Sequence, residues 1–235
     1  MIKLLTFDLD NTLWSIDPII IRAENAMMEW LYENYPELRF RISLVQFEQY
    51  KNRIANEHPE FSHDLTQLRL TTLREVLEGH VKGDIPGIVK KAYEVFHEQR
   101  NRVQYFPYAR EIVEDLSREY PLYALSNGNA DIHKVGIGHL FQQHYSAGTV
   151  GFAKPHPAMF ERALQHAGAK PHEGIHIGDH PIQDVQAAQE VGMKTIWVNW
   201  FNHPWPLSTP PDGIISNFED LPDVIERINA SRTDQ

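Results

Sequence analysis

Two aspartates stand two residues apart in FDLDNTL, residues 7–13, directly after the apolar run at residues 2–7. Side chains two apart on an extended chain share a face, with Cβ atoms about 6–7 Å apart. Because Asp8 and Asp10 would repel each other away from bulk water, either one carboxyl keeps its proton or a cation joins the two. Mg²⁺ prefers oxygen ligands of this kind. The pair therefore indicates a metal site, an acid/base pair, or both.

Two other structures are compatible with an acidic pair in this stretch. Asp10-Asn11-Thr12 could be a polar turn that caps a helix, which is a common arrangement. A calcium loop counted from Asp8 needs glycine at its sixth position and glutamate at its twelfth, but Leu13 and Ile19 stand there. The sequence excludes the calcium loop and leaves the polar turn open.

Three later stretches place polar residues where a strand ends or a helix begins: LSNGN at 125–129, Lys154-Pro155, and IGDHPIQD at 177–184. Ser126 and Asn127 can offer a hydroxyl and backbone N–H groups to an anion, or they form an ordinary turn. Lys154 is either a fixed cation beside phosphate and carboxylates or a solvated lysine at a helix entry. Asp179 can join the metal site, and Asp184 either joins the same group or caps the helix that follows.

Short apolar runs separated by helical patterns are the elements that must position these residues. The sequence predicts strands at 2–7, 120–125, 174–177 and 195–198, and helices at 109–119, 157–167 and 184–191. Strands that alternate with helices form a parallel sheet covered on both faces, and ligands bind beyond the carboxyl ends of its strands. The predicted fold class is α/β, with a Rossmann-like parallel sheet as its core.

Residues 15–103 follow a different pattern. Strand signals stop, and helical periodicity predicts one helix at 18–35 and about three more, at 43–56, 65–77 and 85–102. The simplest topology is an α-helical domain inserted after the first strand. We predict an α/β catalytic core of residues 1–14 and 104–235, and a helical cap of residues 15–103.

The composition limits the classes of partner. The chain has 235 residues and a formal net charge of −10, which argues against nucleic-acid binding and against an acidic membrane surface. It has no apolar run of membrane-spanning length, and its first residues lack the features of a signal peptide. It contains no cysteine, so disulfides and thiolate metal sites are excluded, which fits a cytoplasmic location. The sequence leaves the oligomeric state open.

The order of FDLDNTL, LSNGN, a lone Lys-Pro and GDHPIQD resembles the four signatures of the haloacid-dehalogenase-like (HAD) superfamily of phosphotransferases. The helical insertion after the first signature resembles that superfamily's type I cap, found in subfamily I. The resemblance implies a Mg²⁺-dependent phosphatase that acts on a small phosphorylated metabolite.

The resemblance also implies the chemical roles of three aspartates. Asp8 would be the nucleophile that forms an aspartyl-phosphate. Asp10 would protonate the leaving alkoxide and then deprotonate the attacking water. Mg²⁺ would be held by Asp8, Asp179 and Asp10, the last through its backbone carbonyl.

Five further residues match supporting roles in the same superfamily. Ser126, the Asn127 N–H and Lys154 would hold the phosphate oxygens. Asp184 would orient waters or bond to Lys154, and Thr12 would brace the loop.

The matched residues leave rival functions. Dehalogenases of the superfamily use the first aspartate but lack an acid/base aspartate two residues later, so Asp10 argues against dehalogenation. Phosphomutases share all four signatures, so the core does not exclude them. A catalytically silent binding or regulatory protein is the rival from another class, and the intact set of polar residues argues against it.

Within the predicted cap, HDLTQLRL (63–70) offers two candidate substrate contacts, His63 and Arg69. The alternative is a capped helix with a solvated arginine. This stretch, the cap start and SNGNA resemble bacterial flavin mononucleotide (FMN) phosphatases, which also dephosphorylate 5-amino-6-(5-phosphoribitylamino)uracil in riboflavin synthesis. The resemblance makes these two esters the best candidate substrates.

Two other groups of residues attract attention but favour structural roles. The aromatic residues of NWFNHPWP (199–206) could stack on a flat ring, but they more often pack under a loop or form a dimer contact. His176 and His180 stand four apart across the end of a predicted strand, which does not suit a zinc site. We expect both histidines to make local hydrogen bonds.

Overall fold

The computed structural model describes residues 1–230 and divides the chain into two compact units. The α/β unit comprises Met1–Ser15, Gln104–Gly128 and the described chain from Ile132 onward. The helical unit comprises Ile16–Val103 together with Asn129–Asp131. The first break lies one residue after the predicted 14/15 boundary and the second at 103/104. The short return to the helical unit at 129–131 was not predicted.

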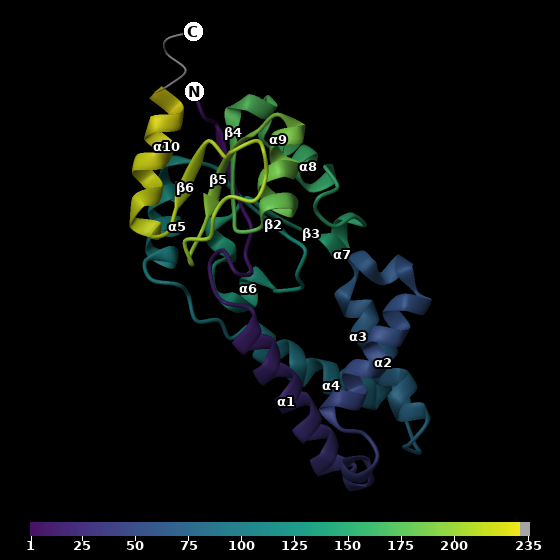
Figure 1. Cartoon of the computed structure of the whole chain (residues 1–235). Coiled ribbons are helices and arrows are strands. Elements are labelled where there is room, and N and C mark those ends of the chain that lie inside the picture. Colours follow the sequence, from purple (N-terminus) through teal and green to yellow (C-terminus); the bar gives the residue numbers. More distant parts are fainter. Residues whose placement is uncertain (231–235) are drawn as a thin grey trace. The chain divides into compact units, whose positions relative to one another are not determined.

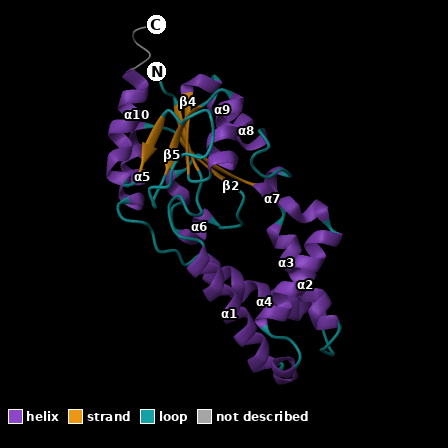
Figure 2. Cartoon of the chain, viewed as in Figure 1, coloured by secondary structure: helices purple, strands orange, loops and turns teal. Residues whose placement is uncertain are grey.

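The α/β unit is built on one six-stranded parallel sheet, which confirms the predicted fold class. Figure 2 draws its strands in orange. The strand order is β3-β2-β1-β4-β5-β6. The strands are β1 Leu4–Phe7, β2 Leu122–Ser126, β3 Gln143–Ser146, β4 Gly174–Gly178, β5 Lys194–Val198 and β6 Gly213–Ile215.

The three central strands, β1, β2 and β4, are buried along their whole length. This is typical of a parallel sheet covered on both faces, and it explains why these strands read as apolar runs. The two edge strands gave no such signal, because β3 has the polar sequence QHYS and β6 has only three residues.

Helices cover both faces of the sheet (Figure 1). The helices α8 (Ala158–Ala167) and α9 (Ala187–Val191) lie on one face, while α5 (Ala109–Glu119) and α10 (Leu221–Ala230) lie on the other. Apolar residues on one side of α8 are buried against the sheet, as its helical spacing predicts. The unit also contains the short helices α6 (Ile132–Val135) and α7 (Ala147–Val150).

The helical unit has four main helices around a core of its own. They are α1 (Asp17–Asn34), α2 (Leu44–Glu57), α3 (Leu65–Glu78) and α4 (Ile85–Arg100). Side-chain caps begin three of them, with Ser43, Asp64 and Asp84 each accepting a bond from a first-turn backbone N–H. Within residues 1–230, no helix combines the length and the apolarity needed to cross a bilayer.

The segment Asn129–Asp131 is tied to the helices of its unit by side chains. The Asn129 amide donates to Thr66 Oγ1 at 3.3 Å and accepts from Arg100 Nε at 3.3 Å. The backbone N–H of Asp131 donates to Asn101 Oδ1 at 2.7 Å. These bonds explain why three residues that follow β2 in the sequence belong to the helical unit.

Candidate active site

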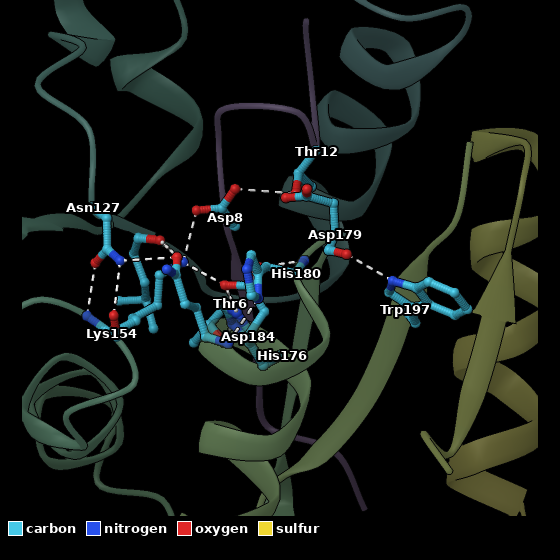
Figure 3. Close-up of polar contacts among 12 residues, drawn as sticks. Thr6, Asp8, Thr12, Asn127, Lys154, His176, Asp179, His180, Asp184 and Trp197 are labelled. Atoms are coloured by element: carbon cyan, nitrogen blue, oxygen red, sulfur yellow. Dashed lines mark hydrogen bonds and ion pairs between the residues drawn. The ribbon is translucent and has the colours of Figure 1, made fainter. Parts of the chain in front are cut away.

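Three carboxylates converge beyond the carboxyl ends of β1 and β4 (Figure 3). One oxygen from each of Asp8, Asp179 and Asp184 lies within 4.8 Å of the others. Asp8 follows β1 directly and Asp179 follows β4 directly. The carboxyl ends of parallel strands meet at one edge of a sheet, which brings the two residues together. Asp184 lies in the π-helical segment Pro181–Gln186, and its Oδ2 accepts a bond from the His180 N–H at 2.9 Å.

The Lys154 ammonium lies among these carboxylates, 3% exposed. Its Nζ is 2.7 Å from Asp8 Oδ1, 2.5 Å from Asp184 Oδ1 and 2.8 Å from the Leu125 carbonyl. An ammonium has three N–H donors, and here each has an acceptor. Lys154 is therefore a fixed cation rather than a solvated lysine at a helix entry.

The side chain of Asn127 binds the backbone of Lys154. The Asn127 Oδ1 accepts from the Lys154 N–H at 2.7 Å, and its Nδ2 donates to the Lys154 carbonyl at 2.9 Å. The same Nδ2 also donates to Gln183 Oε1 at 3.2 Å. The sequence predicted the Asn127 N–H as a phosphate donor, but gave no signal for this contact of its side chain.

Two hydroxyls belong to predicted site residues. Thr12 Oγ1 is 3.1 Å from Asp8 Oδ2 and 3.2 Å from Asp179 Oδ1, so its single hydrogen can serve one carboxylate at a time. Ser126 is buried at the end of β2, and its Oγ accepts from the Gly128 N–H at 3.0 Å.

The carboxylate of Asp10 is not part of the three-carboxylate group. It is half-buried, and its Oδ1 accepts a bond from the Trp14 indole at 2.8 Å. The predicted ligand at this residue is its backbone carbonyl, and the acid/base role of its carboxyl stays a prediction.

The pKa values of the three carboxyl groups are shifted in different directions. Burial, with Asp184 and Lys154 acting in opposite directions, raises the pKa of Asp179 from 3.8 to about 7. Burial also raises the pKa of Asp8 well above its usual range, although the Lys154 ammonium opposes the shift. The pKa of Asp184 is held below its usual range because the charge and hydrogen bonds of Lys154 and His176 outweigh its burial.

This charge balance fits a bound divalent cation. Three buried or half-buried carboxylates face a single ammonium, which leaves an excess of negative charge when all three are ionised. Burial is the main cause of the raised pKa values of Asp8 and Asp179, and the charge of Asp184 adds to it. Oxygen donors of this kind match Mg²⁺, and Asp8 and Asp179 are the side chains that would hold it.

Two side chains of the sheet, His176 of β4 and Thr6 of β1, form a line of contacts that ends at the Asp184 carboxylate. His176 is 1% exposed, with Nε2 3.2 Å from Asp184 Oδ1 and Nδ1 2.7 Å from Thr6 Oγ1. Burial lowers the pKa of His176. The local hydrogen bonds predicted for both histidines are present, since His180 Nδ1 accepts from the backbone N–H groups of Ile182 and Gln183.

Two tryptophans bond to the loops that carry the site, and the sequence gave no signal for either contact. The Trp197 indole donates to the Asp179 carbonyl at 2.6 Å, and the Trp200 indole donates to the Asn11 carbonyl at 3.0 Å. Trp200 also stacks on Phe106 and Phe218, with ring centroids 4.2 and 5.6 Å away. The prediction that the aromatic residues of 199–206 pack under a loop or form a dimer contact agrees with these contacts for Trp200, whereas Phe201 is 75% exposed.

The two candidate substrate contacts lie in the helical unit. His63 is half-buried, directly before the cap residue of α3. Arg69 is 7% exposed, pairs with Glu24 at 3.0 Å and lies over the Phe96 ring at 3.7 Å. Arg69 is therefore not a solvated arginine, and the substrate contacts of His63 and Arg69 stay predictions.

Comparison with known proteins identifies the family. The family model described as haloacid dehalogenase-like hydrolase matches residues 2–192. The 5-amino-6-(5-phospho-D-ribitylamino)uracil phosphatase YigB of Escherichia coli is 28% identical over 199 residues, which cover 84% of this chain and 83% of that protein. A phosphoserine phosphatase of Thermus thermophilus is 31% identical over 150 residues, 61% of this chain and 59% of that protein.

A solved structure is also similar along nearly the whole chain. A 2-haloacid dehalogenase from Pseudomonas syringae pv. Tomato is 36% identical, with a TM-score of 0.90, and the match covers 97% of this chain and 99% of that one. Since the family model covers well over half of the residues, and all four predicted signatures lie within it, this chain belongs to the haloacid dehalogenase-like hydrolase family.

Proposed function

We propose that this protein is a Mg²⁺-dependent phosphomonoester hydrolase that acts through an aspartyl-phosphate on Asp8. The observation that carries the proposal is the environment of the Asp8 carboxylate. It is buried at the tip of the central strand, with the Lys154 ammonium on one oxygen and the Thr12 hydroxyl on the other. The phosphatase-named relatives of this family support the same activity.

In the proposed first step, an oxygen of Asp8 attacks the phosphorus of the ester and the bond to the leaving oxygen breaks. Asp10 donates a proton to that oxygen, which leaves as an alcohol. In the second step, Asp10 takes a proton from a water that attacks the phosphorus. The bond between Asp8 and phosphorus breaks, inorganic phosphate is released, and Asp8 is a free carboxylate again. A bound Mg²⁺ supplies positive charge that offsets the repulsion between carboxylate and phosphate.

Ser126, the Asn127 N–H and Lys154 are the proposed phosphate-binding groups. All three Lys154 donors already have acceptors, so a contact with phosphate would replace or share one of them. The lysine thereby has two roles in the proposal: it orients Asp8 before the attack, and it offsets charge on the phosphate during it.

The favoured substrates are FMN and 5-amino-6-(5-phosphoribitylamino)uracil. The support for them is the 28% identity to a phosphatase of the second compound, and the cap role of residues 15–103 stays a prediction. We expect kcat/KM for FMN to exceed that for simple sugar phosphates by about tenfold or more. Comparable slow rates on every ester would remove the flavin assignment and leave a phosphatase of broad specificity.

A dehalogenase is the second candidate, because the similar structure from Pseudomonas syringae carries that name. Attack by Asp8 on a carbon that bears a halogen would also give an ester of Asp8. A halide leaves without a proton, however, so this reaction gives the Asp10 carboxyl no role as an acid. A phosphate ester requires that role, since its leaving alkoxide is strongly basic.

The deciding experiment measures phosphate, halide and isomer formation from a panel of FMN, sugar phosphates and 2-halo acids, with Mg²⁺ and with EDTA. We expect phosphate release that needs Mg²⁺ and that Asp8→Asn abolishes. Asp223→Asn, at an acidic residue of α10 outside the site, is the matched control and should keep the wild-type rate. Undiminished phosphate release by Asp8→Asn would refute the nucleophile. Halide release would favour a dehalogenase, and isomer formation without phosphate release would favour a mutase.

A further inference from the structure

A buried polar chain runs across the sheet to the Asp184 carboxylate. Thr6 of β1 and His176 of β4 face each other in the register of the two strands and are 0% and 1% exposed. Thr6 Oγ1 lies 2.7 Å from His176 Nδ1, and His176 Nε2 lies 3.2 Å from Asp184 Oδ1 (Figure 3). The proposed mechanism uses neither residue.

The direction of these hydrogen bonds follows from counting protons. A carboxylate only accepts, so the ring nitrogen that faces Asp184 must carry a hydrogen. A neutral imidazole has one N–H, which leaves Nδ1 as an acceptor for the Thr6 hydroxyl. The opposite tautomer would place a lone pair of Nε2 against the carboxylate. The Asp184 carboxylate therefore selects the tautomer with the hydrogen on Nε2. The Thr6 hydroxyl, which also lies 3.4 Å from the Ile175 carbonyl, supports that tautomer when it donates to Nδ1.

The carboxylate held in this way controls the position of Lys154. Asp184 Oδ1 receives both His176 Nε2 and Lys154 Nζ, while its Oδ2 receives the His180 N–H. The same ammonium then reaches Asp8 Oδ1 at 2.7 Å. Donors on both oxygens fix the orientation of the Asp184 carboxylate. The fixed carboxylate in turn fixes the position of the Lys154 ammonium.

We propose that Thr6 and His176 are positioning residues, which fix Asp184 and, through it, hold the Lys154 ammonium against the nucleophile. The assignment of Asp8 as nucleophile rests on the proposed function. An apolar side chain in place of His176 would remove one of the two donors to Asp184 Oδ1, so that Lys154 and the His180 N–H alone would hold the carboxylate, and hold it less firmly. The Phe160 ring is nearly perpendicular to the imidazole, with ring centroids 4.9 Å apart, and limits any other orientation of it.

The first test compares two isosteric substitutions on the strands that flank β4, which are β1 and β5. Thr6→Val removes the hydroxyl that supports the Nε2–H tautomer. Thr195→Val is the matched control, because Thr195 is 0% exposed and pairs with His176 in the β4–β5 register, but its hydroxyl faces Asp212 and Gln189. We expect Thr6→Val to lower kcat for the best phosphate ester several-fold with little change in KM, and Thr195→Val to keep wild-type values.

The second test replaces the ring. His176→Leu removes the donor to Asp184, and loss of a supporting partner of this kind lowers activity by about 10- to 100-fold. His176→Gln should recover part of that loss, because the glutamine Nε2 can donate to Asp184. If His176→Leu fails to fold, the comparison of Thr6→Val with Thr195→Val still decides the question.

The third test needs no turnover. Nitrogen-15 NMR of the wild-type protein should show His176 with its hydrogen on Nε2, assigned by the loss of its signals in His176→Gln. The buried Lys154 ammonium should give its own signal, which shifts in Thr6→Val and stays in place in Thr195→Val. A hydrogen on Nδ1, an unmoved ammonium, or wild-type kinetics for Thr6→Val and His176→Leu would overturn the proposal. If the wild-type protein hydrolyses no phosphate ester, the proposed function fails, while the NMR signals still decide whether the chain positions Lys154.

Discussion

Lys154 is the residue on which the charge balance of the site depends. Its ammonium contacts two carboxylates that are themselves buried. Removing one member of a buried ion pair leaves its partner without compensation. The stability of the protein and the orientation of Asp8 therefore depend on the same side chain.

We expect Lys154→Met to abolish phosphate release and to lower the free energy of unfolding by about 3–5 kcal/mol, measured by denaturant titration. The control is Lys194→Met, which breaks a pair with Asp212 at 2.7 Å in which the lysine side chain is 37% exposed. An exposed pair contributes about 0–1 kcal/mol, so the control should lose little. Equal losses in the two variants would contradict the structural role of Lys154.

Asp179 gives the site a dependence on pH. Its pKa rises from 3.8 to about 7 in the folded chain, so folding takes up a proton between these values. In the absence of metal, the melting temperature should therefore fall as the pH rises from about 4 to about 7, and Asp179→Asn should weaken this fall. Thermal melting in EDTA at a series of pH values measures the effect.

The same proton competes with a metal. Binding of Mg²⁺ through Asp179 requires the ionised carboxylate, so the stabilisation by Mg²⁺ should grow with pH up to about 7 and then level off. A stabilisation that is independent of pH in this range would show that Asp179 does not hold the metal.

At the scale of elements, the end of β5 supports the loop after β4. The Trp197 indole donates to the Asp179 carbonyl at 2.6 Å and packs edge-on against Trp205, with ring centroids 5.0 Å apart. The backbone that carries Asp179 is thereby fixed by a neighbouring strand of the sheet. The bond to the Asp179 carbonyl restrains the loop, and Trp197, which donates that bond, is itself 4% exposed.

We expect Trp197→Phe, which keeps an aromatic ring and removes the N–H donor, to raise the Mg²⁺ concentration needed for half-maximal thermal stabilisation by about fivefold, the equivalent of one hydrogen bond of about 1 kcal/mol. Trp205→Phe is the control, because its indole donates to the Thr209 carbonyl at 3.0 Å instead. If both variants respond to Mg²⁺ like the wild-type protein, the bond from Trp197 does not position Asp179.

The elements that the sequence predicted are those whose pattern is local. The strands at the centre of the sheet are apolar along their length, and α5 begins and ends at the predicted residues. The edge strand β3 was missed because its polar side chains carry no period that marks a strand. The helix predicted from Asp184 begins earlier, at Pro181, as a π-helical turn.

The sequence likewise predicted the site residues that a local pattern marks, but not the contacts between residues far apart in the chain. Its aspartates, serine and lysine follow strands or precede helices, which is a signal along the chain. The partnership of Thr6 with His176 depends on the pairing of strands 170 residues apart, so no local spacing reveals it. The pairing of Arg69 with Glu24, 45 residues earlier, was likewise not visible in any local spacing.

At the scale of the whole molecule, each unit has a hydrophobic core of its own. Met27 of α1 is fully buried in the core of the helical unit, and Met159 of α8 is fully buried in a core of the α/β unit. Because the two cores are separate, a cavity in one removes packing from that unit alone.

Matched substitutions test whether the units are separate in stability. Met27→Ala and Met159→Ala should each lower the free energy of the affected unit by about 2–5 kcal/mol. Amide hydrogen exchange followed by mass spectrometry should show faster exchange in α1–α4 for the first variant and in the sheet for the second. Equal acceleration in both units, in either variant, would show that they unfold together.

The three residues Asn129–Asp131 have a consequence for the making of chimeras. A splice that exchanged residues 16–103 for the insertion of a relative would bring in foreign partners for the Asn129 amide, which meets Thr66 and Arg100 here, and for the Asp131 N–H, which meets Asn101. A graft of the helical unit should therefore carry two pieces of chain, the long insertion and the tripeptide after β2, so that the transplanted fragment keeps the bonds with which it folds.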